Sequence, residues 1–332
     1  IDTNCKGLVY MTKAVLPGFI KRNNGHIINI GSVAGSYPYA GGNVYGGTYR
    51  IMTQIMENLG LSASWIDTSD LELVKAAITS KTKMIVIESP TNPMMQLTDI
   101  QAVSKISKEN SLLLVADNTF MSPYYQRPIS LGADLVMHST TKYINGHSDV
   151  IGGILIAKKQ KLIDKLRFIQ MSVGAVPSPF DCWIVQRSLK TLPVRMDRHN
   201  YNAYEISKFL KKSNKIKSIY YPGLTDHPNH KIAKKQQLNP SNEVVFGGMI
   251  SIDLGSLSKA RKFVKNLNIF ILAESLGGIE SLVCHPATMT HASIPMKVRN
   301  ELGITDGLVR LSIGIEDIND LVEDLKNAIN KI

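Results

Sequence analysis

Lys142 stands in the segment HSTTKYINGHSDVIGG, directly after a short apolar run, Ala133–Met137. Two hydroxyl residues, Ser139 and Thr141, come just before it. A lysine amine adds to a carbonyl carbon once it has lost its proton, and hydroxyl groups can bind a phosphate. Upstream, Asp117 ends another apolar run, LLLVAD, and supplies a carboxylate. The segment and its neighbour therefore offer a nucleophile, a carboxylate and phosphate ligands.

These are the three groups that pyridoxal phosphate requires: a lysine that forms a Schiff base, a carboxylate that keeps the pyridine nitrogen protonated, and donors for the phosphate. Each residue alone has a simpler interpretation, as a surface lysine, a turn or cap aspartate, or a strand-end hydroxyl that bonds the backbone. Their combination at successive strand ends indicates a pyridoxal-phosphate enzyme.

The elements that must position these residues alternate regularly from Ser69 onward. Ser69-x-x-Glu72 predicts a capping box ahead of a helix, and MIVIES predicts a buried strand. A helix over 98–110 follows, and then strands at LLLVAD and ADLVMH. This order favours a mainly parallel sheet, whose ligands gather at the carboxyl ends of the strands. The polar residues that fall at those ends are Glu88, Asn92, Asp117 and Lys142.

The second half of the chain predicts a separate set of elements. The segment AVPSPFDCWIVQRSLKTLPVRM indicates a turn and a helix that lead into a long helix ending near Lys212. Strands are expected in VVFGGMISIDL and GLVRLSIGI, and an amphipathic helix over 318–329 closes the chain. We therefore expect residues 1–47, 48–190 and 191–332 to form an N-terminal piece, a cofactor-binding large domain and a smaller C-terminal α/β domain.

The composition limits the partners. The 332 residues are 44% hydrophobic and contain no apolar run of membrane-spanning length, so we expect a cytoplasmic α/β protein. The net charge of +11 comes from scattered lysines without a basic, aromatic-interleaved stripe, which indicates a solvated surface and no nucleic-acid partner. Three cysteines, at positions 5, 182 and 284, lie too far apart for a metal-ligand pattern, and we expect no metal.

Residues from about Val44 to Ile332 resemble the cystathionine γ-lyase and γ-synthase family of fold-type-I pyridoxal-phosphate enzymes. The resemblance rests on segments in the family's order and spacing: VYGGTYR, ESPTNP, VADNTF, HSTTKYINGHSDVIGG, GAVPSPFDCW, ESLGGIES, HPATMTH and GLVRLSIGIED. It implies the fold-type-I architecture, pyridoxal 5'-phosphate as the cofactor, an amino-acid substrate and a homotetramer.

The resemblance also implies roles for individual residues. Lys142 would attach the cofactor, and Tyr45 would stack on its ring and assist proton transfer. The other cofactor residues would be Asp117 at the pyridine nitrogen, Asn92 and Thr119 near the phenolic oxygen, and Ser139 and Thr141 at the phosphate. The substrate residues would be Arg310 at the α-carboxylate, Ser275 beside it, and Arg50 and Glu274 at the entrance. Without the resemblance, Arg310 could equally be a strand arginine paired with Glu316 or Asp317.

The expected activity is that of a cystathionine γ-lyase, which converts L-cystathionine to cysteine, 2-oxobutanoate and ammonia. Gly47 stands where methionine γ-lyases tend to carry a cysteine, and GAVPSPFDCW followed by RSLKTLPVRM is similar to the γ-lyases. Cystathionine γ-synthase is the alternative.

Residues 1–47 resemble the middle of a short-chain dehydrogenase, with Asn4, Ser32 and Tyr45 at that family's catalytic positions and HIINIGS as a strand of a partial Rossmann sheet. The family's lysine is replaced by Tyr49, and its glycine-rich cofactor loop is missing. The chain thus resembles a chimera of the two families, joined at Val44–Gly46. Such a chimera lacks the segment with which the lyase family cradles the cofactor's phosphate. We therefore expect weaker cofactor binding than in an intact lyase. An NAD(P)-dependent oxidoreductase and an inactive chimeric remnant are the alternatives from other classes.

Overall fold

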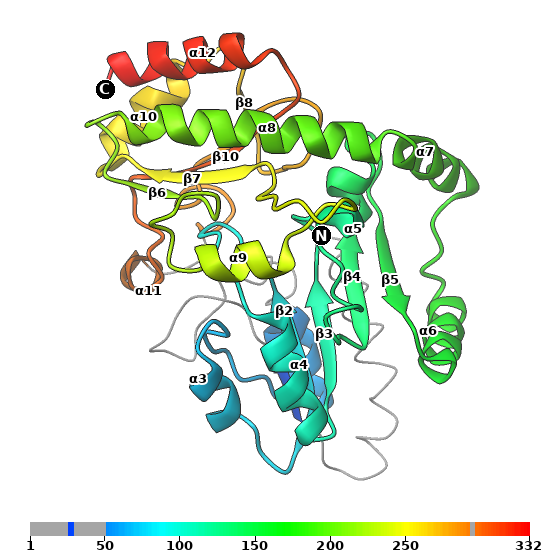
Figure 1. The fold of residues 1–332 in the computed structure, drawn as a ribbon. Coiled ribbons are helices and arrows are strands. Elements are labelled where there is room, and N and C mark those ends of the chain that lie inside the picture. Colours follow the sequence, from blue (N-terminus) through cyan, green and yellow to red (C-terminus); the bar gives the residue numbers. More distant parts are fainter. Residues whose placement is uncertain (1–25, 30–50, 293–295) are drawn as a thin grey trace.

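The computed structural model describes residues 26–29, 51–292 and 296–332. Over these residues the chain forms two five-stranded sheets that follow one another in the sequence (Figure 1). The first sheet has the spatial order β1-β2-β3-β4-β5, and the second has the order β6-β7-β10-β9-β8.

The first sheet is parallel except at one edge. Its strands are β1 (His26–Asn29), β2 (Thr82–Glu88), β3 (Leu113–Asp117), β4 (Leu135–Ser139) and β5 (Gly153–Ala157). Strands β1 to β4 pair in parallel, and β5 pairs antiparallel with β4. The apolar runs of β2, β3 and β4 are buried, as expected of parallel strands covered on both faces. The strands predicted from MIVIES, LLLVAD and ADLVMH are confirmed, and of the strand predicted from HIINIGS the described residues His26–Asn29 form β1.

Helices cover this sheet and connect its strands. Short helical turns at Ile51–Met56 (η1) and Glu57–Leu59 (η2) precede α3 (Leu71–Ala76), and α4 (Ile100–Glu109) connects β2 to β3. The capping-box prediction at Ser69 is wrong by one residue. Asp70 is the N-cap and accepts the backbone N–H of Glu72 at 2.9 Å, while the Ser69 hydroxyl donates to Asp67 instead. An ionised carboxylate accepts at a helix start at least as well as a hydroxyl.

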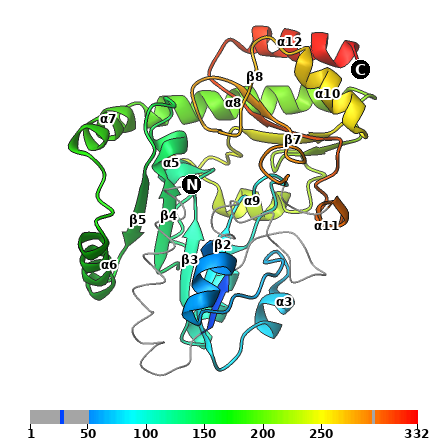
Figure 2. The same cartoon turned by 180° about the vertical axis from the view of Figure 1, so that it is seen from behind.

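Beyond β3, the chain forms α5 (Ser122–Tyr125), β4, a π-helical turn η3 (Thr140–Ile144), and β5. Helices α6 (Gln160–Val173) and α7 (Pro179–Leu189) then project from the side of the molecule beside β5, as both views show (Figures 1 and 2). Only Ile169 of α6 and Ser188 of α7 are buried.

Helix α8 (Leu192–Lys211) runs the length of the second sheet (Figure 1). That sheet contains β6 (Ser218–Tyr220), β7 (Met249–Asp253), β8 (Ile271–Leu272), β9 (Leu282–Cys284) and β10 (Leu308–Ser312), with β10 antiparallel to both β7 and β9. The remaining helices are α9 (His230–Gln236), α10 (Leu257–Lys265), α11 (Met296–Glu301) and α12 (Ile318–Asn330). Leu321, Leu325 and Ile329 of α12 are buried, which confirms the predicted amphipathic helix.

Candidate active site

The carboxyl ends of β2, β3 and β4 face the second sheet, and most of the predicted site residues meet there (Figure 1). Lys142, Asp117, Asn92, Thr119 and Ser139 come from the first sheet and the turns that follow its strands. Arg310 and Ser275 come from β10 and from the loop after β8. Tyr45 and Arg50 lie outside the described residues, as do Asn4 and Ser32.

Lys142 lies in a turn that departs from regular helix. β4 ends at Ser139, η3 follows at once, and the Lys142 backbone has φ −88° and ψ −135°, outside the helical region. The side chain is 4% exposed, and its Nζ donates to Ser275 Oγ at 3.1 Å. A buried amine at a strand end, aimed across at the other sheet, is placed to react with a ligand between them.

Asp117 is oriented by Thr119. The Thr119 backbone N–H and hydroxyl both donate to Asp117 Oδ1, at 3.0 and 2.5 Å. The same hydroxyl accepts the backbone N–H of Ser139 at 3.0 Å, which connects the ends of β3 and β4. Burial raises the pKa of Asp117 from 3.8 to about 6, and the two Thr119 hydrogen bonds oppose that rise. The carboxylate is therefore ionised near neutral pH but poorly solvated, as a partner for a bound cation would be.

Glu88 is a second buried acid at this edge. It is the register partner of Asp117 on the neighbouring strand, so the two side chains leave the same face of the sheet. Burial raises the pKa of Glu88 well above its usual range, and the Asp117 charge raises it further. The sequence predicts Glu88 only as a polar residue at a strand end and indicates no role for it. The structure thus places two buried carboxyl groups side by side at this edge, and the pKa of each is raised.

Arg310 is the largest fully buried side chain of the described residues, at 1% exposed. Its Nη1 donates to Asn92 Oδ1 at 2.9 Å, and its Nη2 donates to the carbonyls of Glu274 and Ser275, each at 2.9 Å. Its Nε–H has no hydrogen-bond partner. Glu316, the ion-pair partner considered from the sequence, instead accepts from Ser281.

A buried guanidinium held by neutral oxygens keeps an uncompensated positive charge. Such a group favours an anionic ligand, and its planar fork matches a carboxylate. The contacts of Arg310 therefore agree with binding of a carboxylate and not with an internal ion pair. Glu274, whose carbonyl helps hold Arg310, has an exposed side chain, as an entrance residue would.

The two hydroxyls predicted to bind phosphate differ. Ser139 is 4% exposed at the end of β4. The Thr141 hydroxyl instead accepts the backbone N–H of Gly152 at 2.9 Å and donates to the Gly152 carbonyl at 3.3 Å. This contact is the backbone-bonding alternative considered from the sequence, and phosphate binding by Ser139 and Thr141 stays a prediction.

A close approach at Gly277 fixes the Ser275 loop against the turn of Lys142. The backbone of Gly277 has φ +74°, and a Cβ there would lie 2.9 Å from the Tyr143 backbone nitrogen. Its N–H donates at 2.8 Å to Oγ of Ser312, the last residue of β10, which also carries Arg310. Only glycine fits both the conformation and the space, so this residue sets how closely the two halves of the site approach each other.

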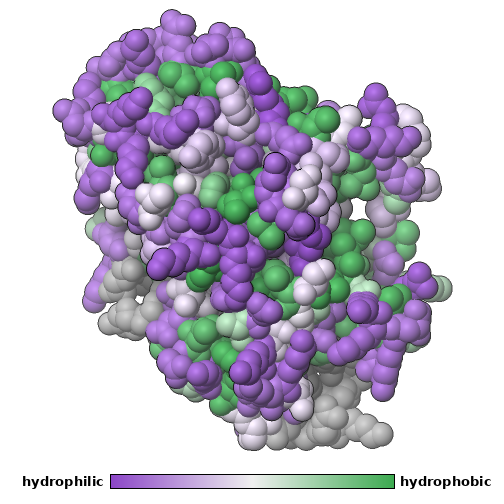
Figure 3. Space-filling model, viewed as in Figure 1, coloured by the Kyte–Doolittle hydropathy of each residue, from purple (hydrophilic) through white to green (hydrophobic). Residues whose placement is uncertain are grey.

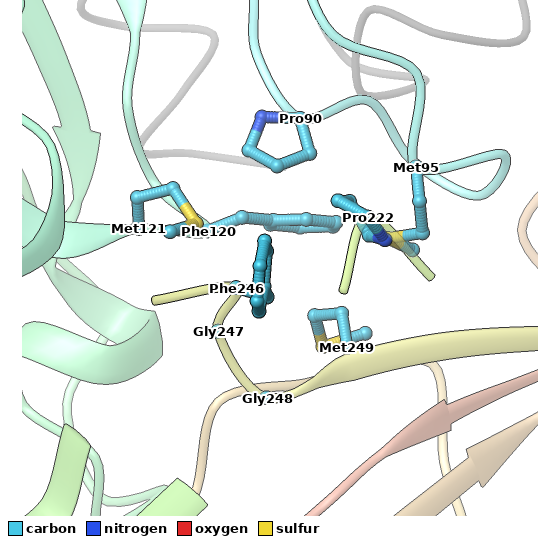
Figure 4. Close-up of a pocket in the computed structure, with 9 residues that line it drawn as sticks. All are labelled: Pro90, Met95, Phe120, Met121, Pro222, Phe246, Gly247, Gly248 and Met249. Atoms are coloured by element: carbon cyan, nitrogen blue, oxygen red, sulfur yellow. The ribbon is translucent and has the colours of Figure 1, made fainter. Parts of the chain in front are cut away.

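A pocket also lies between the two sheets, and none of the site residues named above lines it. It is lined by Pro90, Met95, Phe120, Met121, Pro222, Phe246, Gly247, Gly248 and Met249 (Figure 4). This lining offers no acid, base or nucleophile, so the pocket is an apolar contact between the two halves. Within the described ranges, no group of three or more His, Cys, Asp or Glu side chains could hold a metal ion, and no helix could cross a membrane.

Comparison with known proteins gives the same assignment over most of the chain. A model of the family described as Cys/Met metabolism PLP-dependent enzyme matches residues 32–330. Cystathionine gamma-lyase of Dictyostelium discoideum is 50% identical over 290 residues, covering 87% of this chain and 73% of that protein. Cystathionine beta-lyase of Lactococcus lactis subsp. cremoris is 48% identical over 298 residues, covering 90% and 77%.

Among solved structures, cystathionine gamma-lyase from Lactobacillus plantarum, complexed with L-serine, has a TM-score of 0.85 to this chain at 40% identity. The match covers 96% of this chain and 80% of that one. The likeness confirms the expected fold-type-I architecture.

Proposed function

Because the chain belongs to the Cys/Met metabolism PLP-dependent enzyme family, we propose that it is a cystathionine γ-lyase in which Lys142 carries the cofactor and Arg310 binds the substrate carboxylate. One observation carries this proposal. Lys142 Nζ donates to Ser275 Oγ and Arg310 Nη2 donates to the Ser275 carbonyl, so both side chains meet at one residue. An α-amino acid has its carboxylate and its reacting carbon one bond apart, and so needs a cation for the carboxylate and an amine for the α proton close together.

The residues present fit pyridoxal phosphate. Asp117 is a buried carboxylate suited to a protonated pyridine nitrogen, Ser139 offers a buried hydroxyl for phosphate, and Lys142 offers a buried amine. The unpartnered buried oxygen Oε2 of Glu88 lies at the same sheet edge. When bound, the cofactor supplies an electron sink for the charge that develops at the substrate α carbon.

The protein's own side chains then have distinct tasks. Arg310 would fix the α-carboxylate and so orient the α C–H bond toward Lys142. The Lys142 amine, freed from the cofactor, would accept the α proton at Nζ and deliver a proton in later steps. Ser275 would hold Nζ in place between these steps. Tyr45, expected to assist proton transfer, stays a prediction.

A cystathionine β-lyase is the second candidate, because relatives with that name match nearly as well as those named γ-lyase. The products separate the two reactions. Cleavage at the γ carbon of L-cystathionine releases cysteine, 2-oxobutanoate and ammonia, whereas cleavage at the β carbon releases homocysteine, pyruvate and ammonia. Identification of the keto acid and the thiol by mass spectrometry decides between them. A γ-synthase would instead join cysteine to an activated homoserine.

The first test is the visible absorption spectrum of the chain after addition of pyridoxal phosphate and removal of the excess. We expect a cofactor band in the parent and in Lys159→Ala, which removes an exposed lysine paired with Asp134. Lys142→Ala should lack this band. A band that persists without Lys142 would refute its assignment. No band in any variant would identify an inactive remnant.

We also infer that the chain assembles as a homo-oligomer, a tetramer by resemblance. Large apolar side chains of α6 and α7 are exposed, among them Phe168 (72%), Met171 (78%) and Trp183 (58%). Hydrophobic side chains also gather along the edge that carries these helices and β5 (Figure 3). Exposed apolar surface of this kind is typical of a subunit interface. A mass by light scattering equal to one chain would refute the inference.

The remaining expectations stay predictions. None of the matches reported above supports the short-chain dehydrogenase resemblance of residues 1–47, and the family match begins inside that stretch, at residue 32. An oxidoreductase activity would appear as turnover that depends on a nicotinamide cofactor. The three-part domain division and a cytoplasmic location are likewise inferred from sequence alone.

A further inference from the structure

Three of the buried polar side chains of helix α8, Arg195, His199 and Asn202, follow one another at helical spacing. Residues at i, i+4 and i+7 share one face of a helix. None of them had a role in the site as described above. All three donate to backbone carbonyls, so this face of α8 holds the neighbouring main-chain segments in place.

Arg195 contacts the turn that carries Lys142. Its Nη1 donates to the Tyr143 carbonyl at 2.7 Å and its Nη2 to the Ile144 carbonyl at 3.2 Å. Nη2 also donates to the Ser188 carbonyl at 3.0 Å, and Nε donates to Thr191 Oγ1 at 3.0 Å. The two carbonyls of the turn belong to the residues directly after Lys142. We propose that Arg195 is a positioning residue, which holds this turn so that the Lys142 amine faces the substrate.

The local backbone supports this role. Gly146, which ends the turn, has φ +71°, and a Cβ at this position would collide with Arg195 Nη1. The Gly146 N–H donates to the Lys142 carbonyl at 2.7 Å. The arginine fork and the turn therefore pack directly against each other. A lysine at 195 would keep the charge, but a single ammonium lacks the planar fork that spans two adjacent carbonyls.

The other two side chains attach the same helix to the strand of Arg310. Burial lowers the pKa of His199 to about 4, so the ring is neutral, and its Nδ1 donates to the Ile313 carbonyl at 2.7 Å. Asn202 Nδ2 donates to the carbonyls of Gly314 and Glu316, each at 3.0 Å. Residues 313–316 directly follow β10. Helix α8 therefore fixes the Lys142 turn relative to the Arg310 strand.

The test uses Arg195→Met and Arg195→Lys, with Arg198→Met as the matched control on the same helix. The Arg198 guanidinium donates to the Glu316 carbonyl, and not to the Tyr143 and Ile144 carbonyls that Arg195 binds. Hydrogen exchange of the peptide covering residues 139–146 is measured first, on the cofactor-free chain. We expect exchange about tenfold faster in this peptide for Arg195→Met, with the control unchanged. This readout needs no activity.

The kinetic part rests on the proposed function. We expect kcat for the lyase reaction to fall about 100-fold in Arg195→Met with KM nearly unchanged, because the amine is displaced while Arg310 is intact. The kcat of Arg195→Lys should lie between that of the parent and that of Arg195→Met. If Arg195→Met shows the same exchange rate over residues 139–146 as the parent, or the same kcat, the proposal is overturned. If Arg195→Met does not fold, Arg195→Lys decides by the same criteria. If the parent binds no cofactor, the proposed function fails, but the exchange result still decides the role of Arg195.

Discussion

Replacing Asp117 with Asn should make the cofactor-free chain more stable while it weakens cofactor binding. The substitution removes the charge but keeps an oxygen that can accept from the Thr119 N–H and hydroxyl. In the parent, burial raises the pKa of Asp117 from 3.8 to about 6. An acid with a raised pKa in the folded state holds its proton better when folded than when unfolded. The ionised carboxylate therefore destabilises the folded state.

The magnitude follows from the two pKa values. Below pH 3.8 the carboxyl is protonated in both states, and its charge has no effect on stability. As the pH rises from 3.8 to about 6, the unfolded chain loses this proton first, so the parent loses stability over that window. Above pH 6 the loss is complete, at about 3 kcal/mol for a gap of this size. We expect Asp117→Asn to recover most of that free energy at pH 8.

The assay is urea unfolding of the cofactor-free parent and variant between pH 4 and pH 8. The difference between the two chains is the relevant quantity, because carboxyl groups remote from Asp117 titrate equally in both, and Glu88, whose pKa the Asp117 charge raises, is the one neighbour that changes with it. Asp320→Asn, which removes an exposed carboxylate, is the control and should give a small, nearly constant difference. Cofactor affinity, measured by spectral titration, should fall in Asp117→Asn. A stability difference that does not grow with pH, or a variant less stable at pH 8, would refute the reasoning.

Four further substitutions test other parts of the structure. Arg310→Lys should leave the cofactor band intact and weaken binding of amino acids roughly 10- to 100-fold, because an ammonium cannot replace the fork; a spectral titration with a non-reacting amino acid measures this. Leu325→Ala, at a fully buried position of α12, should lower the free energy of unfolding by about 2–5 kcal/mol, and a loss below 1 kcal/mol would contradict the packing. Asp70→Ala should cost about 1 kcal/mol as the cap of α3, whereas Ser69→Ala should cost clearly less; the reverse order in thermal unfolding would favour the original capping-box prediction.

The parts of the fold that could be predicted from the sequence are those set by local patterns. Buried parallel strands are apolar along their whole length, and β2, β3 and β4 stand out for that reason. The parallel order then places Asp117 and the residues before Lys142 at one edge. Arg310 could be named only through its segment GLVRLSIGIED, since its contacts with Asn92 and with the loop at Ser275 cross more than 30 residues.

What could not be predicted depends on geometry at the scale of one hydrogen bond. Ser69 and Asp70 are both good cap residues, and only the backbone at Asp70 decides between them. For Thr141 the sequence leaves open whether the hydroxyl binds phosphate or the backbone, and its contact with Gly152 is seen only in the folded chain. Arg195 carried no signal beyond its place in RSLKTLPVRM. Arg195 donates to three backbone carbonyls in the folded chain. In the sequence it cannot be told apart from any other arginine of a helical segment.

The buried charges of the site are held by neutral groups and not by each other. Among the ion pairs of the described residues, none includes Asp117 or Arg310; the pairs involve partly exposed side chains such as Lys159 with Asp134. An internal pair of Asp117 with Arg310 would satisfy both charges, but a ligand would then have to break it before binding. The two residues lie on different sheets, β3 and β10, and the Arg310 fork is held instead by Asn92 and by the carbonyls of Glu274 and Ser275. The arrangement leaves a carboxylate for a cationic ring and a guanidinium for a carboxylate, at some loss of stability in the empty chain.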